Sequence, residues 1–104
     1  MLPTQTIQAA VDRIVAAANP SRVILFGSYA RGEANDDSDL DLMVVEPVVE
    51  DRAAEMIRLR RAVGRVGIGV DVLVYSDAEF DERKDWLSHV VYWAALEGKV
   101  LYER

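Results

Sequence analysis

The chain has 104 residues, 51% of them apolar, and a formal net charge of −6. These values predict one globular domain over residues 1–104 and exclude an intrinsically disordered chain. No cysteine is present, which excludes disulfides and thiolate metal sites and fits a cytoplasmic protein. No apolar run reaches membrane-spanning length, and the acidic balance disfavours direct contact with nucleic acid.

Helical and strand-like patterns alternate along the chain. Apolar residues recur at helical spacing over residues 5–18, with Thr4 or Thr6 as the expected cap, and Asn19–Pro20 ends this helix. The later elements expected are a strand over 22–26, a short helix from Tyr29 to about Gly32, a strand over 39–46, a helix over 51–64, a strand over 70–75, helices over 77–84 and 86–97, and a strand over 100–102.

This order of elements predicts an α/β (α+β) fold with a mixed central sheet of three to four strands and helices mainly on one face. Strand alternation places one set of apolar residues under those helices, namely Leu40, Leu42, Val44, Val70, Val72 and Val74. The opposite face is expected to have little left to cover it.

Several residues of the later helices have expected roles. Asp51 is the expected cap of the helix over 51–64, and Ser76 or Asp77 that of the helix over 77–84. The helix over 86–97 is apolar nearly all round, so it should be well buried or meet another chain. The inward stripe expected for the helix over 51–64 is Ala53, Met56, Leu59 and Val63.

Three arginines, Arg58, Arg61 and Arg65, share another face of the helix over 51–64. A solvated basic face is the simplest interpretation, and a contact for phosphate or an acidic partner is the alternative. His89, the only histidine, is expected to be structural or exposed and is assigned no metal. Tyr29 is expected to pack rather than to stack on a base.

The stretch from Gly27 to Asp41 reads GSYARGEANDDSDLD and follows an apolar strand. Gly27 has no Cβ, so the backbone can turn sharply there, and Ser28 begins a short helix whose free N–H groups suit phosphate. Asp39 and Asp41 are two positions apart on a strand and therefore point to one face. Two adjacent carboxylates repel each other unless a cation lies between them, which favours Mg²⁺ with a nucleoside triphosphate.

Asp71 interrupts the apolar alternation of the third strand. A carboxylate inside a buried strand needs a partner, and the alternative is an aspartate at a frayed strand start beside Gly69. Arg31, one turn into the short helix, could neutralise phosphate charge or could simply be solvated.

Gly27–Ser28, ten intervening residues and Asp39-x-Asp41 resemble the signature of the DNA polymerase beta-type nucleotidyltransferase superfamily. The flanking Ala30–Gly32 and Ser38–Leu42 are similar to its minimal nucleotidyltransferase (MNT) branch. The resemblance implies two Mg²⁺ ions held by Asp39 and Asp41, with Asp71 as a third metal ligand and general base. It also implies that Gly27, Ser28 and Arg31 hold the phosphates of ATP.

The short chain lacks the additional domains with which polymerases and antibiotic-modifying members grip their acceptors. In this it resembles the MNT antitoxins, which pair with a helical HEPN-family ribonuclease toxin. The resemblance implies transfer of AMP from ATP to a tyrosine of that toxin. Two alternatives stay open: a non-catalytic antitoxin that acts by binding alone, and nucleotidyl transfer to a small molecule.

Overall fold

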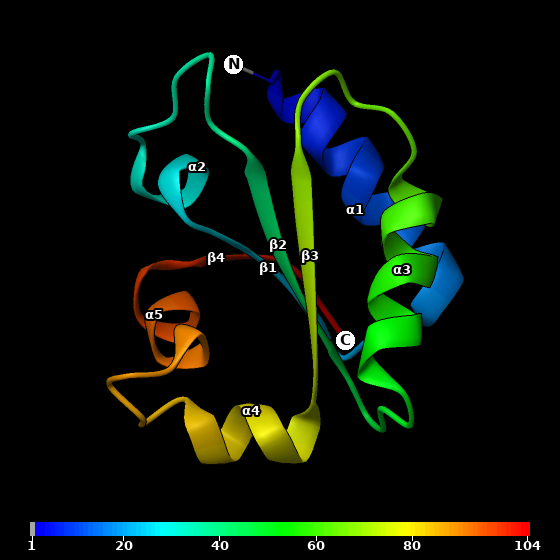
Figure 1. Cartoon of the computed structure of the whole chain (residues 1–104), viewed down its shortest axis with the longest axis vertical. Coiled ribbons are helices and arrows are strands. Elements are labelled where there is room, and N and C mark those ends of the chain that lie inside the picture. Colours follow the sequence, from blue (N-terminus) through cyan, green and yellow to red (C-terminus); the bar gives the residue numbers. More distant parts are fainter. Residues whose placement is uncertain (1) are drawn as a thin grey trace.

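The computed structural model describes residues 2–104 and shows a four-stranded sheet flanked by helices (Figure 1). Its elements are α1 (Thr4–Ala18), β1 (Arg22–Phe26), α2 (Ser28–Arg31), β2 (Leu40–Glu46), α3 (Arg52–Val63), β3 (Val70–Ser76), α4 (Asp77–Arg83), α5 (Val90–Glu97) and β4 (Lys99–Glu103). None of the helices described over residues 2–104 is long and apolar enough to cross a membrane.

The strands lie in the order β3-β2-β1-β4, so β2 and β1 are central and β3 and β4 form the edges. β1 pairs antiparallel with both β2 and β4, whereas β2 pairs parallel with β3. The predicted mixed sheet and α/β fold are therefore confirmed. Because β2 and β3 run the same way, the residues that begin these two strands meet at the same end of the sheet.

One face of the sheet is covered by α1 and α3, which lie together on the right of Figure 1. The apolar residues predicted to lie beneath helices all belong to this core, and Leu40, Leu42 and Val44 are fully buried. Burying a side chain of this size contributes about 1.5–3 kcal/mol, so this layer holds β2 and β3 firmly in register.

The opposite face carries a second, smaller core. Phe80 of α4 and Val91 and Ala94 of α5 pack against Ile24 and Met43 of the central strands. The expectation that this face has little to cover it is therefore wrong for the part occupied by α4 and α5. The start of β2 and β3 is the part of this face that carries acidic rather than apolar residues.

The predicted caps were correct for two helices and wrong for one. Asp51 accepts a hydrogen bond from the Ala54 N–H at 3.1 Å, and Ser76 forms a capping box with Glu79. By contrast, α1 begins after Pro3 with no side-chain cap, so the threonines do not fill that role. Proline suits such a position because its backbone is already restricted and it lacks an N–H.

Two expected buried surfaces are smaller than predicted. Ala53 is exposed because the inward face of α3 begins a turn later, with Leu59 and Val63 fully buried. α5 begins at Val90 rather than residue 86, because the His89 side chain accepts a hydrogen bond from the Val91 N–H and caps the helix there. The apolar residues of this region that remain exposed are Trp86, Leu87, Trp93 and Leu96.

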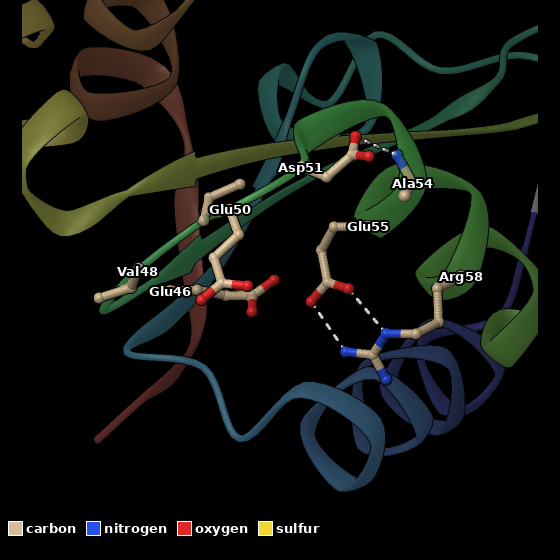
Figure 2. Close-up of a pocket in the computed structure, with 8 residues that line it drawn as sticks. Glu46, Val48, Glu50, Asp51, Ala54, Glu55 and Arg58 are labelled. Atoms are coloured by element: carbon tan, nitrogen blue, oxygen red, sulfur yellow. Dashed lines mark hydrogen bonds and ion pairs between the residues drawn. The ribbon is translucent and has the colours of Figure 1, made fainter.

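A hollow of about 360 Å³ lies between the end of β2 and the start of α3 (Figure 2). Glu46 lines it, is only 8% exposed, and has one carboxylate oxygen without a hydrogen-bond partner in the described residues. Arg58 makes two hydrogen bonds to Glu55, at 2.7 and 2.8 Å, so it is not simply solvated. Burial, followed by the hydrogen bond and charge of Glu55, raises the pKa of Glu46 to about 7.

We predict that Glu46→Gln makes the fold less sensitive to pH. Glu46 has a folded-state pKa above its ordinary 4.5, so the folded state holds a proton that the unfolded state releases. Stability should therefore fall as pH rises from about 5 to 8, and the substitution should remove roughly 1–3 kcal/mol of that fall. Urea denaturation at both pH values measures it. Glu50→Gln, which removes an exposed carboxylate from the same hollow, is the matched control.

A fall in stability that is the same in Glu46→Gln as in the unsubstituted chain would contradict this assignment. It would mean that Glu46 is ionised in the folded state over the whole pH range.

Candidate active site

Asp41 and Asp71 lie directly opposite each other on the parallel strands β2 and β3. Asp41 is half-buried, whereas Asp71, the second residue of β3, is exposed. The expectation that Asp71 lies inside a buried strand is therefore wrong. Its carboxylate is nevertheless hydrogen-bonded to that of Asp41. The parallel register thus places two carboxylates from strands 30 residues apart in sequence on one face of the sheet.

Burial and its acidic neighbours both act on the Asp41 carboxylate. The pKa of Asp41 is raised from 3.8 to about 6, first by burial, then by the charge and hydrogen bond of Asp71, and then by the charge of Asp39. Arg31 acts in the opposite direction and lowers the pKa of Asp41. All three predicted aspartates therefore contribute to one electrostatic environment, in which the full negative charge is unfavourable.

Asp39 lies just before β2, which begins at Leu40 rather than at the predicted residue 39. Its carboxylate packs against Gly69, where an added Cβ would lie 2.4 Å from Asp39 Oδ1. The Leu40 N–H donates to the Gly69 carbonyl at 2.9 Å and fixes this pairing. Gly69 thus makes room for Asp39, a role that we did not predict. Asp39 and Gly69 directly precede Leu40 and Val70, the first pair of the β2–β3 register, and the sequence alone does not give that register.

Gly27 has two functions in this site. Its φ of +73° lies in a region that side chains other than glycine disfavour, and it forms the turn before α2. A Cβ at Gly27 would also lie 2.2 Å from Asp41 Oδ2, so its absence allows the carboxylate to approach the backbone. The sequence predicted the turn, but only the structure shows that Asp41 occupies the space beside it.

Ser28 begins α2, as predicted, and is partly buried beside the Gly27 turn. The Ala30 and Arg31 N–H groups donate to the Gly27 carbonyl at 3.1 and 3.2 Å. The earlier N–H groups, those of Ser28 and Tyr29, fall outside the hydrogen-bonding pattern of a helix. Groups of this kind can bind an anion that approaches the turn.

Arg31 is engaged by other side chains. It forms ion pairs with Glu33 at 3.3 Å and with Glu97 of α5 at 3.8 Å. Together with its effect on Asp41, these contacts place the guanidinium between α2, α5 and the carboxylates. Arg31 is exposed as well as paired, so its role toward phosphate stays a prediction.

The carboxylates of Asp41 and Asp71 are oxygen ligands of the kind that Mg²⁺ prefers. Within residues 2–104 no three acidic, histidine or cysteine side chains are arranged as ligands of one ion. The Asp41–Asp71 pair nevertheless carries a repulsion that a divalent cation relieves, and Mg²⁺ commonly uses one or two carboxylates together with phosphate oxygens and water. The donor set is therefore suited to Mg²⁺ that arrives with a phosphate-bearing ligand.

Two other predicted residues lie elsewhere. His89 caps α5 and contacts Tyr75 and Trp86 edge to face, which is a structural role. The Tyr29 hydroxyl accepts a hydrogen bond from the Leu2 N–H at 3.0 Å, so this side chain packs against the chain's own N-terminal segment, as expected.

We predict that Gly27→Ala displaces the Asp41 carboxylate, whereas Gly64→Ala does not. The two glycines share nearly the same backbone angles, with φ 73° and ψ −156° at Gly27 and φ 72° and ψ −155° at Gly64. Each substitution should cost about 1–3 kcal/mol of backbone strain. A Cβ at Gly64 meets nothing within 4 Å, so only Gly27→Ala pushes on Asp41. Carboxyl NMR shifts of Asp41 measure the difference, and equal shifts in the two variants would contradict the packing described.

Comparisons with known proteins show which family this chain resembles. The nucleotidyltransferase domain family matches residues 7–93. A candidate protein adenylyltransferase of Methanocaldococcus jannaschii is 32% identical over 81 residues, which cover 78% of this chain and 77% of that protein.

Two solved structures share the fold. A candidate nucleotidyltransferase from Sulfolobus solfataricus superposes with a TM-score of 0.66 at 22% identity. The match covers 96% of this chain and 79% of that protein's chain. A toxin–antitoxin structure with AMP-PNP has a TM-score of 0.60 at 20% identity, over 93% of this chain and 73% of that one. With a family match over most of its length and a sequence relative of this similarity, the chain belongs to the nucleotidyltransferase domain family.

Proposed function

We propose that this protein is a Mg²⁺-dependent protein adenylyltransferase that moves AMP from ATP to a tyrosine hydroxyl of a HEPN-family ribonuclease toxin and thereby acts as its antitoxin. The observation that carries the proposal is the pairing of Asp41 with Asp71, beside the Gly27 turn that precedes α2. A metal-assisted phosphoryl reaction needs both features in one place.

The relatives favour a protein acceptor. The Methanocaldococcus jannaschii relative is described as a protein adenylyltransferase, and one of the structures with this fold is a toxin–antitoxin complex with AMP-PNP. The exposed apolar residues around α5 also suit a protein that works in contact with a partner.

On the nucleotide side, the Gly27 turn, Ser28 and Arg31 would hold the phosphates. The N–H groups at the start of α2 would donate to phosphate oxygens, and the Arg31 guanidinium would exchange its ion pairs with Glu33 and Glu97 for the phosphates. Asp39 and Asp41 would hold Mg²⁺, which supplies neutralisation of charge on the phosphates when it is bound.

On the acceptor side, Asp71 would orient the hydroxyl and accept its proton. The hydroxyl oxygen forms a new bond to the α-phosphorus of ATP, and the bond from that phosphorus to the bridging oxygen breaks, which releases pyrophosphate. The proton moves from the hydroxyl to an Asp71 oxygen, and from there to solvent because Asp71 is exposed.

The proposal is tested by incubating the protein with radiolabelled ATP, Mg²⁺ and a purified small helical protein of the HEPN ribonuclease family. We expect label on the helical protein, and a loss of at least about a hundredfold in rate with Asp41→Asn or Asp71→Asn. Asp85→Asn, at an exposed aspartate outside the site, is the matched control.

Tight binding to the helical protein without any label, retained in both variants, would show instead an antitoxin that acts by contact alone. Label on an added amine or sugar alcohol in the absence of a protein partner would show a small-molecule enzyme.

A further inference from the structure

A buried carboxylate at the far end of β2 has no role in the candidate active site. Glu46 ends β2, five positions after Asp41, which corresponds to about 16 Å along an extended strand. Because side chains alternate along a strand, the two residues also point to opposite faces of the sheet. A ligand held by Glu46 is therefore separate from the proposed nucleotide site.

Glu46 lacks the cation that its burial calls for. It is only 8% exposed, and its Oε2 atom has no hydrogen-bond partner within residues 2–104. The guanidinium of Arg58 is engaged elsewhere, since it donates twice to Glu55 and once, at 2.9 Å, to the Ala17 carbonyl. A buried carboxylate is unfavourable unless it is protonated or paired, so Glu46 is open to a cation from outside the chain.

The hollow of about 360 Å³ described above adjoins this carboxylate (Figure 2). Its volume lies within the range of small-ligand pockets. Val48, Val49 and Ala54 give it apolar walls, and the exposed Glu50 lies at its rim. A ligand in the hollow would therefore contact apolar side chains as well as carboxylates.

The charges around the hollow favour an organic cation. Its ionisable lining residues are Glu46, Glu50, Asp51, Glu55 and Arg58, four acids and one base. Asp51 caps α3 and Glu55 pairs with Arg58, which leaves Glu46 and Glu50 without a hydrogen bond or ion pair among the described residues. No three acidic side chains of the described chain are arranged around one metal ion. A cation with an apolar stem suits both the carboxylates and the walls.

We propose that this hollow binds a primary ammonium group carried on an alkyl chain. The ammonium would donate to Glu46, and the chain would lie against Val48 and Val49. A lysine side chain of another protein and a free alkyl diamine share this chemistry. The inference does not rest on the proposed function, because the hollow lies away from the paired aspartates.

Binding should strengthen as pH rises, because an ammonium has only donors and needs ionised Glu46. Burial and then Glu55 raise the pKa of Glu46 to about 7, while Arg58 acts in the opposite direction. The ionised fraction of Glu46 therefore grows from about one-tenth at pH 6 to about nine-tenths at pH 8. An alkylammonium stays charged over this range, so its affinity should rise about tenfold.

Butylammonium and butanol, which share one alkyl chain, test the proposal with the unsubstituted protein. Each is titrated at pH 6 and pH 8 at constant ionic strength, and the amide NMR shifts of Val49 and Ala54 report occupancy. We expect butylammonium to bind about tenfold more tightly at pH 8 than at pH 6. Butanol should bind at least about fivefold more weakly than butylammonium at pH 8, because it lacks the charge.

Three isosteric substitutions assign the effect to one carboxylate. Glu46→Gln should weaken butylammonium about fivefold or more at pH 8 and remove the dependence on pH. Glu50→Gln, at the rim, and Glu82→Gln, at an exposed residue of α4 outside the hollow, should keep the dependence on pH. The comparison of the two probes stands without these variants, so it decides the proposal even if Glu46→Gln unfolds.

Two further ligands distinguish the source of the ammonium. Diaminobutane that binds at least about fivefold more tightly than butylammonium, and loses this advantage in Glu50→Gln, supports a free diamine. Acetyl-lysine methylamide that binds as well as butylammonium, with no advantage for the diamine, supports a lysine side chain of another protein.

Three results would overturn the inference. They are no saturable shift of the Val49 and Ala54 signals, equal affinities for butanol and butylammonium, and a butylammonium affinity that is the same at pH 6 and pH 8. None of them involves turnover or nucleotide, so the proposed function and this site stand or fall separately.

Discussion

The repulsion between Asp41 and Asp71 is the interaction on which the site depends. The parallel pairing of β2 with β3 brings the two carboxylates together, and the buried valines and leucines beneath them keep the strands from separating. The cost of this arrangement is visible in the pKa of Asp41, raised to about 6 by burial and by its acidic neighbours. Two like charges kept together in this way suit the divalent cation that the proposed function requires.

Two glycines make room for the aspartates because they have no side chain. Gly27 and Gly69 each lie where a Cβ would collide with an aspartate oxygen, at 2.2 and 2.4 Å. The first belongs to the turn before α2 and the second to the residue before β3. Two glycines from separate loops therefore define the space available to Asp41 and Asp39, which explains why the short motif alone does not describe the site.

Much of the fold and the composition of the site could be predicted from the sequence. The strands over 22–26 and 70–75 have continuous or alternating apolar residues, and the spacing from Gly27 to Asp41 is specific enough to indicate nucleotidyltransferase chemistry. These features depend on local sequence and on strand alternation, which are read directly from the residues.

Features that depend on tertiary packing could not be predicted in the same way. The apolar run from residue 86 suggests a helix, but the His89 side chain caps it at Val90. The packing of Phe80 on the second face depends on where α4 lies, and the role of Gly69 depends on strand register. The hollow between the end of β2 and the start of α3 joins residues from two elements whose relation no local pattern specifies.

The most direct test of the central claim is a carboxyl NMR titration of Asp41 with and without Mg²⁺ and AMP-PNP. Without them, we expect Asp41 to titrate with a pKa near 6. With both present, bound cation favours the ionised form, so the pKa should fall to its ordinary value of 3.8 or below. A pKa near 6 that Mg²⁺ and AMP-PNP leave unchanged would contradict a site in which these carboxylates hold a metal and a nucleotide.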